Sequence, residues 1–525
     1  MSAGPFVDRR ALLIGGAALA ASGRAGAVPG ATWDADGTLA LRQGRIRGRA
    51  QQGVVAFKAI PYAAPPIGPN RFRAPQPARS WSGVRDGSAW APAPIQPDPA
   101  YVASPEEYFG TAERSEDCLY LNIFAPDAPG PHPVYVWVHG GGNESGAASQ
   151  APFDTGTFAR KGIVCVTVGY RVGALGFLEL GAVLGRAWRG SGNNGLKDIV
   201  AALRWVQANI AAFGGDPARV TLGGESAGGK NVVSLMAAPS ARGLFKRAIV
   251  ESGGETLCDV PRATALGRMA GTWLERRGQP AEALRTLSTA DILALQADLA
   301  AGYGRPFPFR AMIGDDFLPR PPLAAMQARA AAGVGLLIGT NRDEAIVFLD
   351  RKRIGQPLAQ SELSNIDLAI AAPVFDRYRA RYPDLSPIQL RVQFLTAEEY
   401  WRSSMQIAFA HAAVGAAPTY VYRFDRTAES GPFAGWASHV AEMGYAWGRL
   451  DTPIGRAFGQ LPTPANQALA TEMHDRWAAF IIHGSPDHHG AVMWPSLTRS
   501  RAEVRFGDGP THVAPIDEDA LALWT

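Results

Sequence analysis

Residues 219–228 read Arg-Val-Thr-Leu-Gly-Gly-Glu-Ser-Ala-Gly, and this stretch decides which fold the sequence predicts. The first four residues are typical of a strand, since β-branched and apolar side chains suit a pleated sheet. The last five, residues 224–228, are the only G-x-S-x-G motif in the chain. In that motif a sharp turn between strand and helix exposes the serine hydroxyl above a sheet. Alone it is weak evidence in a chain with 59 glycines, where it could equally be an ordinary turn. Its position after a strand, with a helix expected over residues 229–236, makes Ser226 a candidate nucleophile.

Other predicted strands and helices surround this motif. Residues 134–138 (Val-Tyr-Val-Trp-Val) and 163–168 are continuous apolar runs, typical of strands that helices cover on both faces. Residues 198–213 carry apolar side chains at helical spacing and end in a Gly-Gly-Asp-Pro turn. Residues 335–338 form a further apolar strand. Strands that alternate with helices predict an α/β fold with a central, mostly parallel β-sheet flanked by helices.

A glycine run follows the strand at residues 134–138. It reads His-Gly-Gly-Gly over residues 139–142. Consecutive glycines leave backbone N–H groups unshielded, so that they can converge on a developing oxyanion. The alternative is a glycine loop that binds nothing. We assign the N–H groups of Gly141, Gly142 and Ala227 as candidate oxyanion-hole donors.

The N-terminus has the pattern of an export signal. Asp8-Arg9-Arg10 precedes an apolar run over residues 11–21, and small residues end at Ala27. Paired arginines are typical of the twin-arginine class. The run spans only about 17 Å as a helix, too short for a hydrocarbon core of about 30 Å. We therefore predict a signal peptide over residues 1–27 and a periplasmic or secreted protein, with a frayed N-terminal helix as the alternative.

The composition predicts a globular protein. Apolar residues make up 47% and charged residues 19% of the chain, and the net charge of +4 is small for 525 residues. The basic residues are scattered, so nothing indicates nucleic-acid binding. No segment after the signal is long and apolar enough to span a membrane. No Cys/His spacing suggests a metal site.

Five further segments stand beside the two glycine motifs: residues 57–66 (Phe-Lys-Ala-Ile-Pro-Tyr-Ala-Ala-Pro-Pro), 115–122 (Ser-Glu-Asp-Cys-Leu-Tyr-Leu-Asn), 170–173 (Tyr-Arg-Val-Gly), 213–217 (Phe-Gly-Gly-Asp-Pro) and 494–495 (Trp-Pro). Together these motifs resemble those of the type B carboxylesterase and cholinesterase family of α/β-hydrolases. The resemblance extends from about residue 39 to residue 524 and implies one catalytic domain over residues 28–525. It implies the α/β-hydrolase fold, with large loop and helical insertions forming a gorge.

The resemblance also implies the partners of the serine. The family's acid lies in a G-T-N-x-D-E-G segment, which matches residues 339–345 except that Ala345 replaces the last glycine. Its base lies in a G-A-x-H segment, which residues 436–439 match except for the first position. Glu344 thus becomes the acid and His439 the general base, in the chain order of α/β-hydrolases. The implied activity is that of a serine carboxylic ester hydrolase working through an acyl-enzyme, with no cofactor.

The sequence departs from the family pattern around its second signature. Cys118 normally closes a disulfide, but no cysteine stands near residues 93–96, so we predict a free thiol and an unclipped loop over residues 94–114. Tyr108 falls where cholinesterases place a tryptophan that binds quaternary ammonium, and cation–π binding is weaker on tyrosine. Choline esters are therefore not expected as substrates. Two ion pairs, Arg71 with Glu116 and Arg171 with Asp198, are also implied by the family and are structural.

The substrate is the least defined part of the prediction. We expect a small-molecule ester other than a choline ester, such as a xenobiotic or secondary-metabolite ester, and a monomer or weak homodimer. Amide, carbamate or lactone hydrolysis on the same triad stays open, as does a non-catalytic binding module of this family. The predicted substrate-binding residues are Tyr108, Asn143, Phe307 and Phe309.

Overall fold

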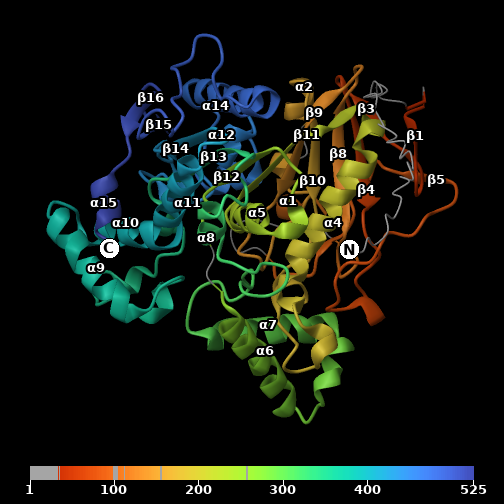
Figure 1. The fold of residues 1–525 in the computed structure, drawn as a ribbon, viewed down its shortest axis with the longest axis horizontal. Coiled ribbons are helices and arrows are strands. Elements are labelled where there is room, and N and C mark those ends of the chain that lie inside the picture. Colours follow the sequence, from red (N-terminus) through yellow and green to blue (C-terminus); the bar gives the residue numbers. More distant parts are fainter. Residues whose placement is uncertain (1–32, 35, 99–104, 112, 154–155, 256–257) are drawn as a thin grey trace, which may run out of the picture.

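The computed structural model describes residues 33–525 except 35, 99–104, 112, 154–155 and 256–257, so the predicted export signal lies outside the described residues. An eleven-stranded sheet crosses the molecule in the order β16-β15-β14-β13-β12-β11-β9-β10-β8-β4-β3 (Figure 1). Its strands are β3 Arg49–Gln51, β4 Val54–Pro61, β8 Tyr120–Pro126, β9 His132–Val138, β10 Val164–Val168, β11 Gly215–Glu225, β12 Arg247–Glu251, β13 Gly335–Asn341, β14 Thr419–Phe424, β15 Ala502–Phe506 and β16 His512–Pro515.

The centre of the sheet is parallel, as predicted. The seven strands from β10 to β15 pair in parallel, whereas β16 on one side and β8, β4 and β3 on the other pair antiparallel. The strands at the centre of the sheet are apolar throughout because successive side chains enter hydrophobic cores on opposite faces of the sheet, as β9 illustrates. Val134 and Val136 belong to one hydrophobic cluster, and Tyr135 and Trp137 to the other.

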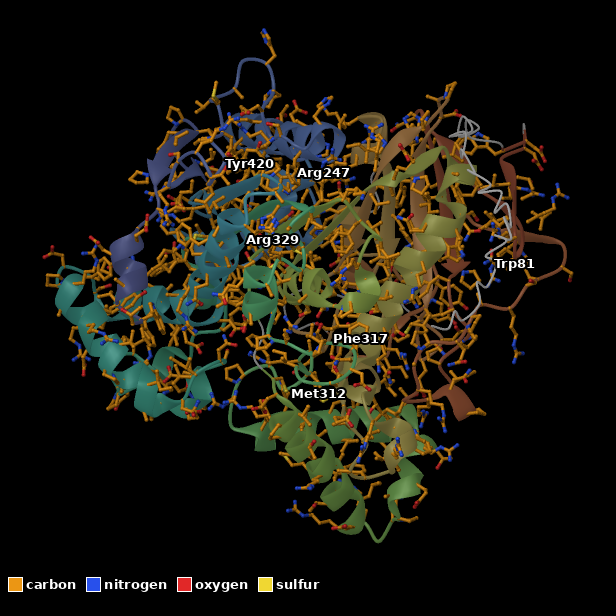
Figure 2. All side chains as sticks on the ribbon, in the orientation of Figure 1. Trp81, Arg247, Met312, Phe317, Arg329 and Tyr420 are labelled. Atoms are coloured by element: carbon orange, nitrogen blue, oxygen red, sulfur yellow. The ribbon has the colours of Figure 1, made fainter. Side chains whose placement is uncertain are left out.

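Helices cover both faces. Residues of α4, α5 and α11 contribute to the first cluster, and residues of α2, α12 and α14 to the second. Side chains fill the space between sheet and helices (Figure 2): near α14, the ring of Tyr420 lies 6.0 Å from that of Phe480, and Arg247 donates to the carbonyl of Ile481 at 3.0 Å. The helices are α1 Pro105–Phe109, α2 Thr157–Arg160, α3 Gly173–Phe177, α4 Asn194–Asn209, α5 Ala227–Ala237, α6 Val260–Glu275, α7 Thr289–Tyr303, α8 Pro322–Gln327, α9 Leu368–Arg381, α10 Pro387–Thr396, α11 Arg402–Ala413, α12 Met443–Ala446, α13 Pro453–Ala457, α14 Pro464–His483 and α15 Glu518–Ala522.

Two insertions extend from the carboxyl half of the sheet. The chain between β12 and β13 includes α6 and α7, which lie together away from the sheet (Figure 1). The chain between β13 and β14 includes α9 and α10, which bury a separate hydrophobic cluster of their own. A π-helical turn over Ala397–Trp401 joins α10 to α11. No helix in the described part of the chain combines the length and apolarity needed to cross a bilayer.

The loop before Cys118 is closed without a disulfide. Cys118 is buried and unpaired, as predicted. A short parallel ladder between β6 (Ala93–Pro94) and β7 (Arg114–Ser115) brings the ends of the loop together, and Arg114 donates to the carbonyl of Gln96 at 2.8 Å. These non-covalent contacts close the loop at the position where the family pattern places a disulfide.

Both predicted ion pairs are present. Arg171 makes a fork-shaped pair with Asp198, with N···O distances of 2.8 and 2.6 Å, and both side chains are fully buried. Arg71 pairs with Glu116 and also donates to the carbonyl of Leu287 at 2.8 Å. Arg71 therefore connects the second signature to the α6–α7 insertion.

Candidate active site

Ser226 occupies a strained turn between β11 and α5. Its φ of +55° and ψ of −124° lie outside the regions that residues with a Cβ normally adopt. The flanking glycines make the turn possible, because a Cβ on Gly228 would lie 2.1 Å from the carbonyl oxygen of Val138. A Cβ on Gly224 would lie 2.6 Å from the carbonyl carbon of Gly228. The motif is therefore a strand–turn–helix junction, and the predicted helix is present as α5.

His439 and Glu344 meet Ser226 at the carboxyl edge of the sheet. The Ser226 hydroxyl donates to Nε2 of His439 at 2.8 Å, and His439 Nδ1 donates to Oε2 of Glu344 at 2.5 Å. The other oxygen of Glu344 accepts the N–H of Asn341 at 2.8 Å. Glu344 follows β13, and His439 lies in the loop after β14. Parallel strands end on the same edge, which explains how residues so far apart in sequence come together.

Aromatic side chains hold the imidazole in place. The ring of Tyr400 lies 4.8 Å from that of His439, and the ring of Phe348 lies 5.2 Å from it. Tyr400 comes from the π-helical turn, a feature often found at functional sites. Tyr400 is almost completely buried, so its ring contacts His439 away from solvent.

Three more buried carboxyl groups surround the Ser226–His439–Glu344 constellation. Glu225 Oε1 lies 3.3 Å from His439 Nε2, and burial together with Glu442 and Glu344 holds the pKa of Glu225 well above its usual range. Burial likewise raises the pKa of Glu442, and it raises that of Glu251 to about 8, although Glu251 accepts from Trp477 Nε1 at 2.7 Å. Such groups bind protons near neutral pH, since several carboxylates cannot all be charged in a buried site. No group of three or more His, Cys, Asp or Glu side chains among the described residues is arranged to hold a metal ion.

The glycine run passes directly beside the serine. A Cβ on Gly140 would lie 3.1 Å from the Cβ of Ser226, and Gly141 and Gly142 have φ values of +105° and +65°. Only glycine adopts such values without strain. Within the described part of the chain, the N–H groups of Gly141, Gly142 and Ala227 donate no hydrogen bond to another residue. Gly141 and Gly142 line the pocket in front of Ser226, and Ala227 is the residue directly after Ser226.

The pocket over Ser226 has a volume of about 250 Å³. Tyr108 and Phe307 line it, as the sequence predicts. Asn143 and Phe309 do not, and that part of the prediction needs correction. The side chain of Asn143 is buried between the carbonyl of Phe309, to which it donates at 3.1 Å, and Asn231, from which it accepts at 2.9 Å. Phe309 is 1% exposed in the core, and Phe307, two residues earlier, has a φ of +55°, so the chain between the two rings is not a regular strand.

Several lining residues were missed in the sequence. Val347 and Phe348 follow Glu344 by three and four positions, so their closeness in sequence to the predicted acid could have placed them at the pocket. Glu144 follows the glycine run by two positions and could have been placed there in the same way. Ile454 comes from α13 and Phe458 directly follows it, and no local pattern connects this segment to the pocket.

Comparison with known proteins agrees with this geometry. The model of the carboxylesterase family matches residues 35–519. The para-nitrobenzyl esterase of Bacillus subtilis is 35% identical over 477 residues, which cover 90% of this chain and 94% of that protein. The fumonisin B1 esterase of Sphingopyxis macrogoltabida is 33% identical over 475 residues, covering 89% and 85%. A solved thermophilic para-nitrobenzyl esterase superposes with a TM-score of 0.82 at 31% identity, over 93% of this chain and all of that one. The chain therefore belongs to the carboxylesterase family, has the α/β-hydrolase fold and is a carboxylic ester hydrolase.

Proposed function

We propose that the protein hydrolyses its ester through an acyl-enzyme on Ser226, with His439 as general base and Glu344 as the acid that orients it. The observation that supports this is the continuous pair of hydrogen bonds, 2.8 Å from Ser226 to His439 and 2.5 Å from His439 to Glu344. A serine hydroxyl is a poor nucleophile unless a base is positioned to take its proton.

In the acylation step, Ser226 Oγ attacks the ester carbonyl while its proton passes to His439 Nε2. Glu344 holds the Nδ1 proton and stabilises the imidazolium that forms. The tetrahedral intermediate collapses, His439 protonates the leaving alcohol, and the acyl group stays on Ser226. Water then attacks the acyl-enzyme with the same proton transfers and releases the acid.

The oxyanion of both intermediates is held by the N–H groups of Gly141, Gly142 and Ala227. Gly141 and Gly142 line the pocket beside Ser226, Ala227 directly follows Ser226, and none of the three N–H groups has a partner among the described residues. Preorganised donors of this kind are effective because they need no rearrangement as the charge develops, and each contributes about 3 kcal/mol to transition-state stabilisation.

The substrate is a non-choline ester, such as a xenobiotic or secondary-metabolite ester. The wall of the pocket beside Tyr108 is apolar, with Phe153, Ile454 and Phe458 among its residues. An apolar wall suits a carbon-rich acyl or alcohol group. No tryptophan lines this pocket in the described part of the chain, and tyrosine and phenylalanine bind a quaternary ammonium more weakly than tryptophan does. Two of the relatives are named for a nitrobenzyl ester and for fumonisin B1, which fits esters of this class.

The test uses the chain from residue 28 onward with p-nitrophenyl butanoate and an organophosphate. We expect hydrolysis, inactivation by the organophosphate, and a phosphorylated peptide containing Ser226 in mass spectrometry. Ser226→Ala should abolish both. The matched control is Ser234→Ala, since Ser234 is a buried serine of the same helix whose hydroxyl only donates to the carbonyl of Lys230 at 2.9 Å. Activity that survives in Ser226→Ala, or a label on another residue, would refute the assignment.

A further inference from the structure

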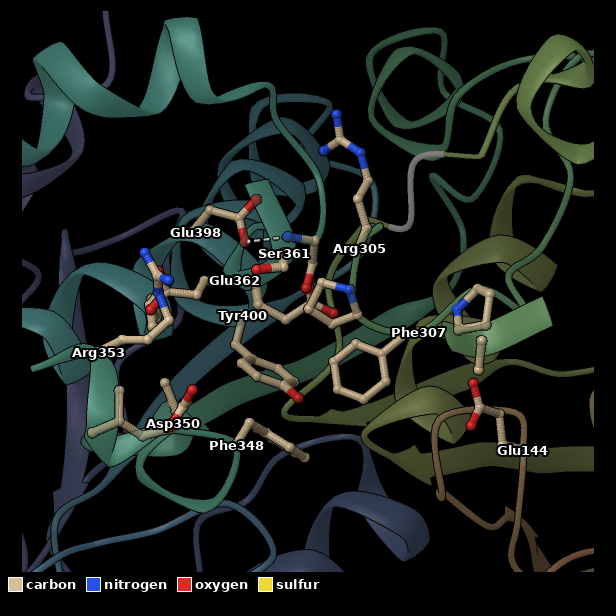
Figure 3. Close-up of a pocket in the computed structure, with 18 residues that line it drawn as sticks. Glu144, Arg305, Phe307, Phe348, Asp350, Arg353, Ser361, Glu362, Glu398 and Tyr400 are labelled. Carbon is tan, nitrogen blue, oxygen red and sulfur yellow. Dashed lines mark hydrogen bonds and ion pairs between the residues drawn. The ribbon is translucent and has the colours of Figure 1, made fainter. Parts of the chain in front are cut away.

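A second cavity adjoins the catalytic pocket. It has a volume of about 480 Å³, and it shares Glu144, Phe307 and Phe348 with the pocket over Ser226. The rings of Phe307 and Phe348 meet edge to face with their centres 5.3 Å apart. Figure 3 shows Glu144 on the other side of the Phe307 ring from Glu398 and Tyr400. These three side chains therefore form the boundary between the two cavities.

Glu144 is held at this boundary by the turn after the glycine run. Its N–H donates to the carbonyl of Gly141 at 2.9 Å. The neighbouring Asn143 is fixed by its hydrogen bonds to Phe309 and Asn231. Since two residues span at most about 7 Å, the side chain of Glu144 starts close to the N–H of Gly142.

The carboxylate of Glu144 differs from the others in the second cavity. Within the described residues, Glu144 makes no side-chain hydrogen bond and no ion pair, although it is only partly exposed. Burial raises its pKa to about 7 even though Arg310 acts in the opposite direction. The remaining carboxylates are all paired: Glu398 with the N–H groups of residues 364–366, Glu399 with Lys230 and Asn365, Glu362 with Arg353 and Arg391, and Asp350 with the N–H of Lys352.

We propose, on the basis of the Ser226 mechanism above, that Glu144 is a specificity residue that binds a protonated amine of the ester substrate. An ammonium group brings the hydrogen-bond donor and the positive charge that this carboxylate lacks. The faces of Phe307 and Phe348 beside it attract a cation more than a neutral hydroxyl. The cations already near these rings, Lys230 and Arg310, face two carboxylates: both contact Glu399, and the charge of Glu398 also acts on both. Because the Glu144 backbone lies within about 7 Å of the Gly142 N–H, the test substrates carry the amine on a short chain from the ester carbonyl.

The experiment compares each amine ester with its neutral isostere in the same enzyme. On the alcohol side the pair is 3-(dimethylamino)propyl butanoate and 4-methylpentyl butanoate. On the acyl side it is butyl 4-(dimethylamino)butanoate and butyl 5-methylhexanoate. Acid release is followed in a pH-stat at about pH 8, where Glu144 is ionised and the amines are protonated. The measured quantity is the ratio of kcat/KM within each pair.

We expect the amine ester to be preferred about tenfold in at least one pair, the effect of one charge-assisted hydrogen bond. The ratio should fall to about one in Glu144→Gln and be partly retained in Glu144→Asp, as a single carboxylate contact implies. Asp350→Asn is the matched control, since it removes a negative charge from the second cavity alone, and it should keep the wild-type ratio.

Three results would overturn the proposal: no amine preference in either pair, an unchanged ratio in Glu144→Gln, or the same loss in Asp350→Asn. Failure of the Ser226 mechanism gives a different result. In that case Ser226→Ala would still hydrolyse the neutral esters, whatever the ratio.

Discussion

Replacing Glu344 by glutamine tests whether this side chain sets the proton positions of His439. The two oxygens of Glu344 both accept: Oε2 from His439 Nδ1 at 2.5 Å and Oε1 from the N–H of Asn341 at 2.8 Å. Glutamine has one oxygen and one NH₂ group at the same places. If its oxygen faces Asn341, its NH₂ faces Nδ1, and the imidazole must carry its proton on Nε2. That nitrogen then cannot accept the proton of Ser226.

The expected loss follows from this tautomer. Removing the acid's carboxylate while keeping its shape lowers kcat by about 10⁴-fold in the serine triads where it has been measured. That factor corresponds to about 5 kcal/mol of transition-state stabilisation. The assay is p-nitrophenyl butanoate hydrolysis at about pH 7, with thermal unfolding as the check that the variant is folded.

Glu251→Gln is the matched control. Glu251 is also completely buried, but its pKa is raised to about 8, so at neutral pH it is already an uncharged acid that glutamine imitates. Its Oε1 needs only to accept from Trp477, which an amide oxygen does as well. We expect activity close to wild type. A Glu344→Gln enzyme that keeps a tenth or more of kcat, or a Glu251→Gln enzyme that loses as much, would refute the reasoning.

Two further predictions concern stability. Asp198→Asn leaves the buried Arg171 without its carboxylate and should lower the free energy of unfolding by about 3–5 kcal/mol in denaturant titrations. The control, Asp376→Asn, breaks the exposed ion pair with Arg379 and should change the free energy of unfolding too little to measure. Equal effects of the two substitutions would contradict the argument. Glu251 has a folded-state pKa of about 8 against an ordinary value of 4.5, so its contribution to stability is present below about pH 4.5 and is lost as pH rises to 8. The free energy of unfolding should therefore decline less steeply over this window in Glu251→Gln, and parallel slopes would contradict that.

The sheet and the centre of the site could be predicted from the sequence because their signals are local. Buried parallel strands need apolar side chains on both faces, and a strand-to-helix turn with no room for a Cβ needs glycine at positions 224 and 228. In both cases the residues that meet the requirement lie close together in the sequence, where they can be recognised. Glu344 and His439 were identified only through the family resemblance, since no local pattern reveals that the ends of β13 and β14 meet Ser226.

The walls of the pocket were harder to predict because remote contacts decide where a side chain points. Asn143 directly follows the glycine run and is one of the four predicted substrate-binding residues. Its side-chain amide instead makes hydrogen bonds with Phe309 and Asn231, which belong to two other segments of the chain. The following residue, Glu144, borders both cavities instead, together with Phe307 and Phe348. If Glu144 binds the substrate as proposed, a substitution at residue 143 changes specificity through its neighbour, because the polar side chain of Asn143 makes hydrogen bonds in the core and Glu144 borders the pocket.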